Sequence, residues 1–574
     1  MSSQNKASSR RGNFVMQAGV LAMAGIIVRI IGILYRAPLT GIIGDEGNGY
    51  YTHAYNIYTI ILLIASYSIP SAMSKVVAQY LAVGENKNAM RIVRMAFFYV
   101  VVVGGAASVL TWFGAPFLVE SRSVPVLRIF TPTIFLSGIL GVLRGFFQSF
   151  KTMVPTSISQ IIEQILNACV SVFAAWLLIR LSGAADPSVI AMRGAMGSAL
   201  GTGSGVLIAL CFLLFILQRY NGRIRDGLKN GDKGAYHILT NKESMKVILT
   251  VVTPFILSTF IYNFSTSLNQ TIYTKIMKLH YHMTEARIAT NYGIFAGKAV
   301  VIANIPIALA SAMSSAIIPS ISSAFAAGDR ERSKRQVETA IRATMTIAIP
   351  SAVGLCALAE PVTGLLFPQK LSLETASFLL MSISVTVIFY SLSTLTNAVL
   401  QGIGRVNTPV RHAAAALVVQ TVVLVILLRF TDLGLYALSI AMIVYSFLMC
   451  VLNQIAVKKA LGYKQEIIRT FILPIYASML MGTFAHISYR VIKEYAHSRI
   501  LSLMLTLVIA VGIYAILMIR SGAVLRSELQ QLPKGDRIER ILDKMGLLQV
   551  ADRRVARYRK RKAEREAKKA KAKR

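Results

Sequence analysis

The chain has 574 residues, of which 55% are hydrophobic and only 15% are charged, and its mean hydropathy is +0.59. A soluble protein of this length could hardly hide so many apolar side chains, so the composition excludes a soluble globular enzyme or binding protein. The net charge of +36 would ordinarily indicate nucleic-acid binding, but orientation in a membrane and a basic C-terminal tail explain it better, so we expect no nucleic-acid partner.

Long uncharged runs follow one another along the chain, and each is long enough to cross a hydrocarbon core, which requires about 20 helical residues. Because only helices or closed barrels satisfy their backbone hydrogen bonds in lipid, these continuous runs predict an all-α integral membrane protein. We expect fourteen transmembrane helices, at residues 14–37, 48–83, 92–116, 125–149, 155–180, 194–219, 246–277, 286–325, 338–358, 372–402, 409–429, 434–457, 468–490 and 500–519.

The spans predict a division of the chain into two lobes. The expected order is a tail (1–13), an N-lobe (14–219), a basic connector (220–245), a C-lobe (246–457), two further helices (458–519) and a basic tail (520–574). Lysine and arginine concentrate in the connectors on the same side as both tails, which predicts that the N- and C-termini are cytoplasmic. The N-terminus lacks a cleavable-signal pattern, so the first apolar run is interpreted as a retained span. The basic tail is expected to rest on anionic membrane lipids.

Two sequence patterns recur about 250 residues apart and indicate an internal duplication. The first is an Ile-Pro-Ser step followed by a small apolar stretch, a Gly-acid pair and a basic run, beginning at Ile69 and again at Ile318. The second is a glutamine, a cation and a proline four residues after the cation, at Gln148, Lys151 and Pro155 and again at Gln401, Arg405 and Pro409. Secondary transporters use pseudo-symmetric duplication to build a central site that can open to either side.

Absent motifs limit the chemistry of the chain. The sequence has no G-x-x-x-x-G-K-[ST] phosphate loop, so we expect no ATP hydrolysis by this chain. The seven histidines show no i, i+4 pairing with an acid, and the four cysteines are scattered singly, so no catalytic residue, metal site or cofactor is predicted. Any transport is then secondary or driven by the membrane potential, with coupling to Na⁺ or H⁺ left open.

Ionisable residues inside the spans are the candidate functional groups, because a charge at the bilayer centre usually faces a cavity or a partner. Arg29 and Arg36 are seven residues apart, which predicts that they share one helical face. Arg144, Glu163 and Lys298 lie in later spans. A cavity lined by Arg29, Arg36, Arg144 and Lys298 would suit an anionic headgroup such as a pyrophosphate.

Each candidate also has a structural explanation. Arg144 and Glu163 could form an ion pair with each other, or Glu163 could serve as a cavity acid or ion-coupling group. Arg36 could extend to the membrane interface. Three polar residues of the seventh span, Asn263, Asn269 and Gln270, are expected to line the cavity wall, although hydrogen bonds between helices would explain them equally well. Glycines at 197, 201 and 205 form a stripe typical of close helix packing.

Several motifs resemble one known family. These are Val28-Arg29-Ile30-Ile31-Gly32 with Arg36, Arg144-Gly145-Phe146-Phe147-Gln148, Ser159-Gln160-Ile161-Ile162-Glu163-Gln164, the segment 318–329, and Ile349-Pro350-Ser351. They resemble the bacterial lipid II flippases (MurJ-like), which belong to the polysaccharide-transport branch of the multidrug/oligosaccharidyl-lipid/polysaccharide (MOP) exporter superfamily. The match is with the Gram-positive type, which includes the SpoVB and YtgP proteins, and it covers residues 12–520.

The resemblance implies a V-shaped, MATE-like transporter with two pseudo-symmetric six-helix lobes and two C-terminal helices in a bacterial plasma membrane. It implies alternating access and an undecaprenyl-pyrophosphate-linked substrate, with the family's first-helix arginine at Arg29 and its eighth-helix cation near Lys298. We therefore expect a lipid II flippase of peptidoglycan biosynthesis, functional as a monomer. Three alternatives stay open: a flippase for another undecaprenyl-linked oligosaccharide, a membrane glycan polymerase, and a cation-coupled drug exporter.

Overall fold

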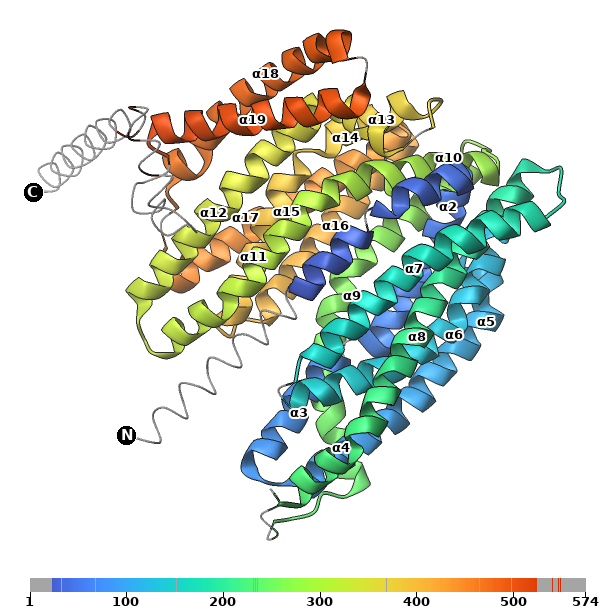
Figure 1. Ribbon diagram of the computed structural model, residues 1–574, viewed down its shortest axis with the longest axis vertical. Coiled ribbons are helices and arrows are strands. Elements are labelled where there is room, and N and C mark those ends of the chain that lie inside the picture. Colours follow the sequence, from blue (N-terminus) through green and yellow to red (C-terminus); the bar gives the residue numbers. More distant parts are fainter. Residues whose placement is uncertain are drawn as a thin grey trace, which may run out of the picture. The chain divides into compact units, whose positions relative to one another are not determined.

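The computed structural model describes residues 23–523, except for single positions 33, 68, 151, 231, 233, 235, 368, 464 and 497, together with four isolated residues beyond 523. Side chains are not described at 66, 67, 71, 72, 223–225, 227, 230, 251–263, 312, 315–320, 323 and 326. The predicted N-tail and most of the predicted basic tail lie outside the described residues. Within the described part every regular element is a helix (Figure 1), which confirms the all-α fold class.

The chain forms two compact units. The first comprises the residues up to Val301 together with Phe367–Ala376 and Val410–Ala441, and the second comprises Ile302–Leu366, Ser377–Pro409 and the residues from Met442 onward. These units do not follow the expected lobes, because residues 246–301 of the expected C-lobe belong to the first unit. Compact packing and internal duplication are different properties, so the two-lobe division stays a prediction.

The first unit contains a helix over Met23–Gly32 and ten labelled helices in whole or in large part. They are α2 (Arg36–Leu62), α3 (Ile69–Val83), α4 (Asn86–Tyr99), α5 (Gly105–Leu118), α6 (Val124–Ser149), α7 (Val154–Leu181), α8 (Pro187–Asn230), α9 (Asn241–Leu279), α10 (Glu285–Ile294) and α16 (Asn407–Phe430). Single π-helical turns follow α2, α4 and α10, at Leu63–Tyr67, Val100–Gly104 and Phe295–Ala299.

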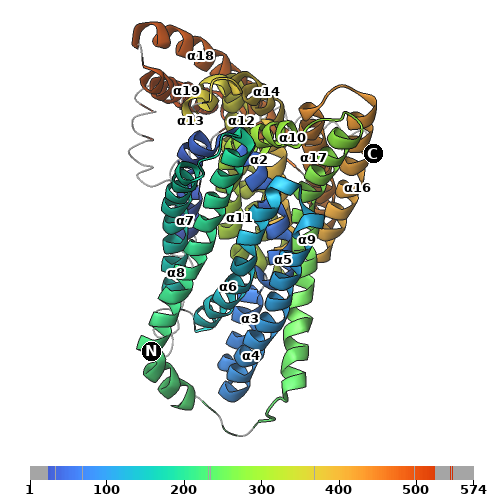
Figure 2. The same cartoon turned by 90° about the vertical axis from the view of Figure 1, so that its right-hand side faces the viewer.

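The second unit holds the helices α11 (Val300–Ala326), α12 (Arg330–Ala357), α13 (Ala359–Leu366), α14 (Leu373–Ile383), α15 (Thr386–Gly402), α17 (Leu435–Leu461), α18 (Leu473–Ala496) and α19 (Arg499–Ser521), some of which begin in the first unit. A π-helical turn at Ile468–Ile472 precedes α18. Figures 1 and 2 show α18 and α19 side by side. Ser498 caps the start of α19, Gly522 ends it in the left-handed conformation, and the Tyr514 hydroxyl donates to the Thr346 carbonyl of α12 at 2.9 Å.

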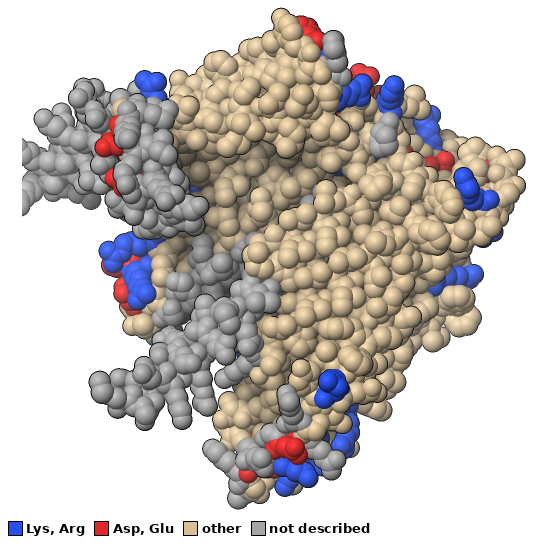
Figure 3. All heavy atoms as spheres, in the orientation of Figure 1, with Lys and Arg blue, Asp and Glu red and all other residues tan. Residues whose placement is uncertain are grey.

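Ten helices of the described part are long and apolar enough to cross a membrane, or up to twelve if each of two bent pairs is one span. This makes the chain a multi-pass membrane protein. The helix α9 is also long enough, but it includes the undescribed side chains 251–263. The expected number of fourteen therefore stays a prediction. In Figure 3 the visible face of the first unit carries few charged side chains between its two ends, where Lys, Arg, Asp and Glu gather.

Three predicted spans differ clearly from the observed helices, and one of them is 372–402, where a 45° bend separates Leu373–Ile383 from Thr386–Gly402. The span 14–37 was expected to be one helix, but the structure has a 43° bend between Met23–Gly32 and the helix that begins at Arg36. The span 48–83 was also expected to be continuous, and the structure divides it into the end of α2, a π-helical turn and α3. Residues 38–47, predicted as an outer connector, lie inside α2. Hydropathy alone does not detect such breaks, because the apolar side chains continue across them.

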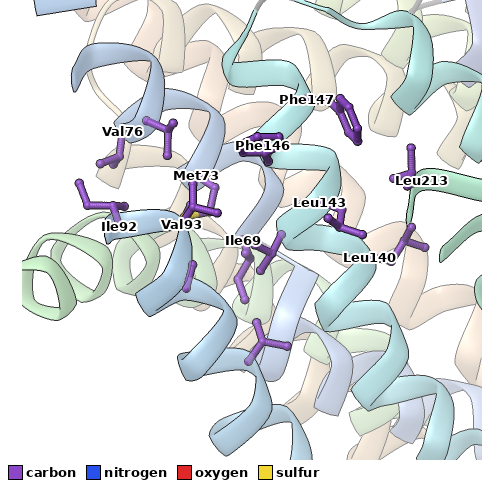
Figure 4. Packing of buried hydrophobic residues seen from close by; sticks show 14 of the residues in the cluster. Ile69, Met73, Val76, Ile92, Val93, Leu140, Leu143, Phe146, Phe147 and Leu213 are labelled. Carbon is purple, nitrogen blue, oxygen red and sulfur yellow. The ribbon is translucent and has the colours of Figure 1, made fainter. Parts of the chain in front are cut away.

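At one end of the first unit, a hydrophobic cluster lies among α3, α4, α6 and α8. Apolar residues at helical spacing on α3 and α6 meet those of α4 and α8, and Figure 4 shows part of this cluster: Ile69, Met73, Val76, Ile92, Val93, Leu140, Leu143, Phe146, Phe147 and Leu213. The backbones of α3 and α6 are close here, since a Cβ on Gly145 would lie 2.8 Å from the Pro70 carbonyl oxygen. This close packing fixes the helix that carries Arg144.

The predicted glycine stripe packs α8 against α7 (Figures 1 and 2). A Cβ would lie 2.3 Å from the Ala175 nitrogen at Gly197, 2.0 Å from Ser171 Oγ at Gly201, and 2.5 Å from the Glu163 carbonyl oxygen at Gly205. Side chains larger than hydrogen do not fit between these backbones. The packing role of the stripe is confirmed.

Replacing Gly201 by alanine should therefore lower stability by about 1–3 kcal/mol, because the added methyl group overpacks the α7–α8 contact. The matched control is Gly222→Ala on the same helix, where a Cβ would meet nothing within 4 Å. That change should be neutral or should stabilise the helix by up to about 1 kcal/mol. Thermal unfolding of the two purified variants in detergent checks this, and equal midpoints would contradict it.

Candidate functional site

Arg29 and Arg36 lie on different sides of the first bend. Arg29 is exposed on the helix Met23–Gly32, and Arg36 is half-buried as the first residue of α2, close to Tyr51 and Tyr55. The prediction that the two arginines share one helical face assumed an uninterrupted helix, whereas Tyr35 lies in a turn between them. They remain close in the chain, one on each side of the bend.

Tyrosines of α2 connect Arg36 with the acid at Glu163. The rings of Tyr51 and Tyr55 stack at 5.5 Å between centroids, and Tyr55 and Tyr58 are 5.8 Å apart. Tyr58 in turn lies near Glu163. The first helix also reaches this region, since a Cβ on Gly32 would lie 3.1 Å from the side-chain nitrogen of Gln164, the residue after Glu163.

Arg144 of α6 and Glu163 of α7 form an ion pair. The Arg144 Nη2 lies 2.6 Å from Glu163 Oε2, and its Nε donates to Ser159 Oγ at 3.0 Å. The two side chains are 14% and 29% exposed, so water screens the pair only partly. Of the alternatives that the sequence left open, the structure forms the ion pair.

We expect Arg144→Met and Glu163→Gln each to lower stability, and the double variant to cost little more than either single variant. The reason is that each single change leaves a partly buried charged or polar group without its partner, and such hydrogen bonds contribute about 1.5–3 kcal/mol. A double-mutant cycle of unfolding midpoints measures the coupling. Additive losses would show that the two side chains act independently.

Lys298 lies in the π-helical turn after α10 and is fully buried. Its Nζ is 2.6 Å from Asp45 Oδ1 and donates to Ser372 Oγ at 2.6 Å, and Ser372 in turn donates to the Asp45 carboxylate. The Phe367 ring lies 5.9 Å from the same Nζ. In this conformation Lys298 is therefore a paired, buried cation rather than a cation open to a cavity, and its predicted contact with substrate requires the pair to separate.

The backbone around Asp45 explains how the pair is buried. Gly44 has φ +70°, which interrupts α2 just before the aspartate. Glycines on α10 and on the following π-helical turn then allow close approach, since a Cβ would lie 2.0 Å from the Asp45 carbonyl oxygen at Gly293 and 1.7 Å from Asn48 Nδ2 at Gly297. Sequence reasoning missed Asp45 as a partner, because it placed this acid in an outer loop. The glycines on both sides of Asp45 indicate a sharp change in the backbone, but they do not identify Lys298 as its partner.

The pair of Lys298 and Asp45 has a third member, Ser372. This residue lies in the segment 367–376, between α13 and the body of α14. Besides Ser372, the side-chain amide of Gln369 donates to the Thr40 carbonyl of α2. This short segment thus attaches to α2 on both sides of Gly44 within the first unit.

The predicted polar wall is engaged in hydrogen bonds between helices. Asn269 Oδ1 accepts from Gln420 Nε2 of α16 at 2.7 Å, and the buried Gln270 accepts from Asn56 Nδ2 of α2. The side chain of Asn263 lies outside the described residues. Hydrogen bonding between helices, which the sequence left as an equal explanation, accounts for the two described residues.

An apolar crevice of about 620 Å³ lies next to the bend that separates the two arginines. Its lining comes from α2, α7 and the turn before α2: Tyr35, Ile42, Ala168, Cys169, Val172, Phe173 and Trp176. Tyr35 lines the crevice and its side chain also contacts the Arg36 guanidinium, so a cation lies next to this apolar surface. This arrangement suits an amphipathic molecule with an anionic group.

The sequence matches two family models. The model described as polysaccharide biosynthesis protein covers residues 14–325, and the MatE model covers residues 296–426. Among curated relatives, the chain is 25% identical to the lipid II flippase MurJ of Bacillus subtilis (strain 168), over 82% of this chain and 87% of the relative. It is 23% identical to stage V sporulation protein B of the same organism, over 90% of this chain and 96% of that relative.

Solved structures agree on the fold. The lipid II flippase MurJ in an inward closed conformation superposes with a TM-score of 0.63 at 14% identity, over 87% of this chain and 97% of that structure. An outward-facing multidrug resistance MATE family transporter of the MOP superfamily superposes with a TM-score of 0.56 at 16% identity, over 78% of this chain and 95% of that structure. The chain belongs to the polysaccharide biosynthesis protein family and is a MurJ-like member of the MOP superfamily.

Proposed function

We propose that this chain is a flippase that moves undecaprenyl-pyrophosphate-linked peptidoglycan precursor, lipid II, from the inner to the outer leaflet. The observation that carries the proposal is the cation at Arg36 beside the apolar crevice of Tyr35, Ile42 and Trp176. An arginine can grip phosphate oxygens through two parallel hydrogen bonds, while the crevice offers the lipid tail an apolar surface. The similarity to a lipid II flippase supports this substrate over other lipid-linked glycans.

Within this proposal, Arg29 and Arg36 make the first contacts with the pyrophosphate. Arg144 and Lys298 contribute only when their pairs with Glu163 and Asp45 open during the cycle. The chain works as a single-chain secondary transporter with both termini in the cytoplasm. Moving one elementary charge across the membrane changes its electrical free energy by about 2.3 kcal/mol per 100 mV, so the membrane potential can supply the driving force.

The test is complementation of bacterial cells depleted of their own lipid II flippase. The chain is expressed at a level verified in the membrane fraction, and growth and cell shape are scored after depletion. We expect rescue. Absence of rescue by a well-expressed chain would overturn lipid II as the substrate and favour another undecaprenyl-linked oligosaccharide, which shares the pyrophosphate.

A second candidate, export of cationic drugs, is favoured by the MatE match over residues 296–426. Cationic substrates require acidic groups in the cavity, whereas the candidates at the first bend are arginines. Ethidium accumulation in cells that lack their own drug exporters separates the two functions. Lower accumulation on expression of the chain, together with failure of the complementation, would favour drug export.

A further inference from the structure

A second cavity, of about 560 Å³, lies at the end of the first unit where α4 begins and α8 ends. Residues from α4, α6, α8 and the connector after α8 line it: Asn86, Lys87, Met90, Val93, Phe97, Leu143, Phe146, Leu217, Gln218, Asn221, Leu228, Lys229 and Asp232. None of the candidate transport residues belongs to this set. Its size is within the range of small-molecule sites, roughly 300–1,000 Å³.

The lining separates into an apolar wall and a charged rim. The wall includes Val93, Leu143 and Phe146, which belong to the packed cluster of Figure 4. The rim carries two cations: the side chain of Lys87 is 61% exposed, and Lys229 is exposed as well. Lys87 is also in the first turn of α4, where the helix dipole favours an anion.

Hydrogen bonds hold the rim in place. The buried Asn86 donates from its side-chain nitrogen to the Leu228 carbonyl at 2.7 Å, and the backbone N–H of Lys87 donates to the Tyr236 hydroxyl at 3.0 Å. These contacts join the start of α4 to the end of α8 and to the connector. The backbone segments that carry the two lysines are therefore held next to each other.

One acid competes with a bound anion at this rim. Asp232 lies 3.8 Å from the Lys87 Nζ, and the backbone N–H of Gly234 donates to its carboxylate at 3.1 Å, which lowers the pKa of Asp232. The acid is thus ionised at neutral pH. Among the residues that line the cavity, two lysines against one aspartate leave a net charge of +1, which favours a net anionic ligand over a zwitterionic one.

We infer that this cavity binds an anionic glycerophospholipid, with one acyl chain against Val93, Leu143 and Phe146 and the phosphate at Lys87 and Lys229. The apolar wall provides burial for the chain, and ammonium groups on flexible stems suit a phosphate at the membrane surface. The ligand is a resident membrane lipid rather than the transported substrate, so this site does not depend on the proposed function.

The test uses tryptophan fluorescence quenched by lipids with brominated chains. The two native tryptophans, Trp112 and Trp176, are replaced by phenylalanine, and Phe97→Trp places one reporter in the cavity lining. The protein is reconstituted in phosphatidylcholine vesicles with 20% brominated phosphatidylglycerol or 20% brominated phosphatidylcholine, about one lipid in five in each case. We expect at least twofold stronger quenching by the anionic lipid. Met90→Trp is a second reporter in case Phe97→Trp does not fold.

Charge variants in the Phe97→Trp background test the rim. Lys87→Ala with Lys229→Ala should abolish the preference for phosphatidylglycerol, and Asp232→Asn should increase it, because the competing carboxylate is lost.

A matched reporter, Phe215→Trp, lies on α8 at a 61% exposed position outside the cavity and should show no preference. Equal quenching of the cavity reporter by both lipids, or no quenching by either, would overturn the inference. The same preference at both reporters would also overturn it, because the effect would then be general to the surface.

Discussion

Replacing Asp45 by alanine should destabilise the protein by about 3–5 kcal/mol, because it leaves the ammonium of Lys298 buried without a counter-charge. The Lys298 side chain is only 1% exposed and that of Asp45 11%, so water cannot replace the missing partner. Lys298→Ala should have a similar cost, since it leaves a mostly buried carboxylate. Both effects are measured by thermal unfolding in detergent, with the loss of monodisperse protein as the signal.

The double variant Asp45→Ala with Lys298→Ala separates the two roles that Lys298 can have. Removal of both charges should recover most of the lost stability, because neither ion is left unpaired. Transport is then measured on a folded protein: recovery of complementation would mean that the lysine acts through the pair alone. A stable double variant without transport would instead support the predicted contact between Lys298 and the substrate. No recovery of stability would contradict the pair itself.

The positions of the helices could be predicted from the sequence because the hydrocarbon core of the bilayer offers no hydrogen-bond partners to the backbone. Every backbone polar group must be paired inside the membrane, so a long run that is uncharged up to its last residue, such as 194–219, has few alternatives to a helix. Breaks in helices were harder to predict. The bend before Arg36 and the π-helical turn after α2 occur inside apolar runs, where no change in composition marks them.

The candidate site was predicted in part. The pair of Arg144 and Glu163 could be anticipated, because adjacent antiparallel spans bring residues at similar depth together. The pair of Lys298 and Asp45 could not, since the two residues lie on elements far apart in sequence and hydropathy placed Asp45 in a loop. Charges inside spans are therefore visible in a sequence, but their partners depend on helix contacts that only a three-dimensional structure supplies.

Replacing Arg29 by alanine should abolish the rescue of cells depleted of their lipid II flippase and lower the rate of flipping at least tenfold. Arg29 is exposed on the helix Met23–Gly32, inside the predicted first span, where a cation is costly unless it faces water, a partner or a ligand. A charged hydrogen bond to phosphate contributes about 1.5–3 kcal/mol, and 1.4 kcal/mol corresponds to a factor of ten. Complementation and a flipping assay in proteoliposomes, at equal membrane expression, measure the effect.

Two further variants determine whether the charge or its geometry matters. Arg29→Lys should restore only part of the activity, because lysine keeps the charge but cannot make two parallel hydrogen bonds to a phosphate. Arg94→Ala removes an exposed arginine from α4, which is outside the proposed path, and should rescue fully. Full activity of Arg29→Ala would remove this residue from the mechanism. Equal loss in Arg94→Ala would mean that the assay responds to net charge, since only Arg29 lies in the helix that reaches α7 at Gln164.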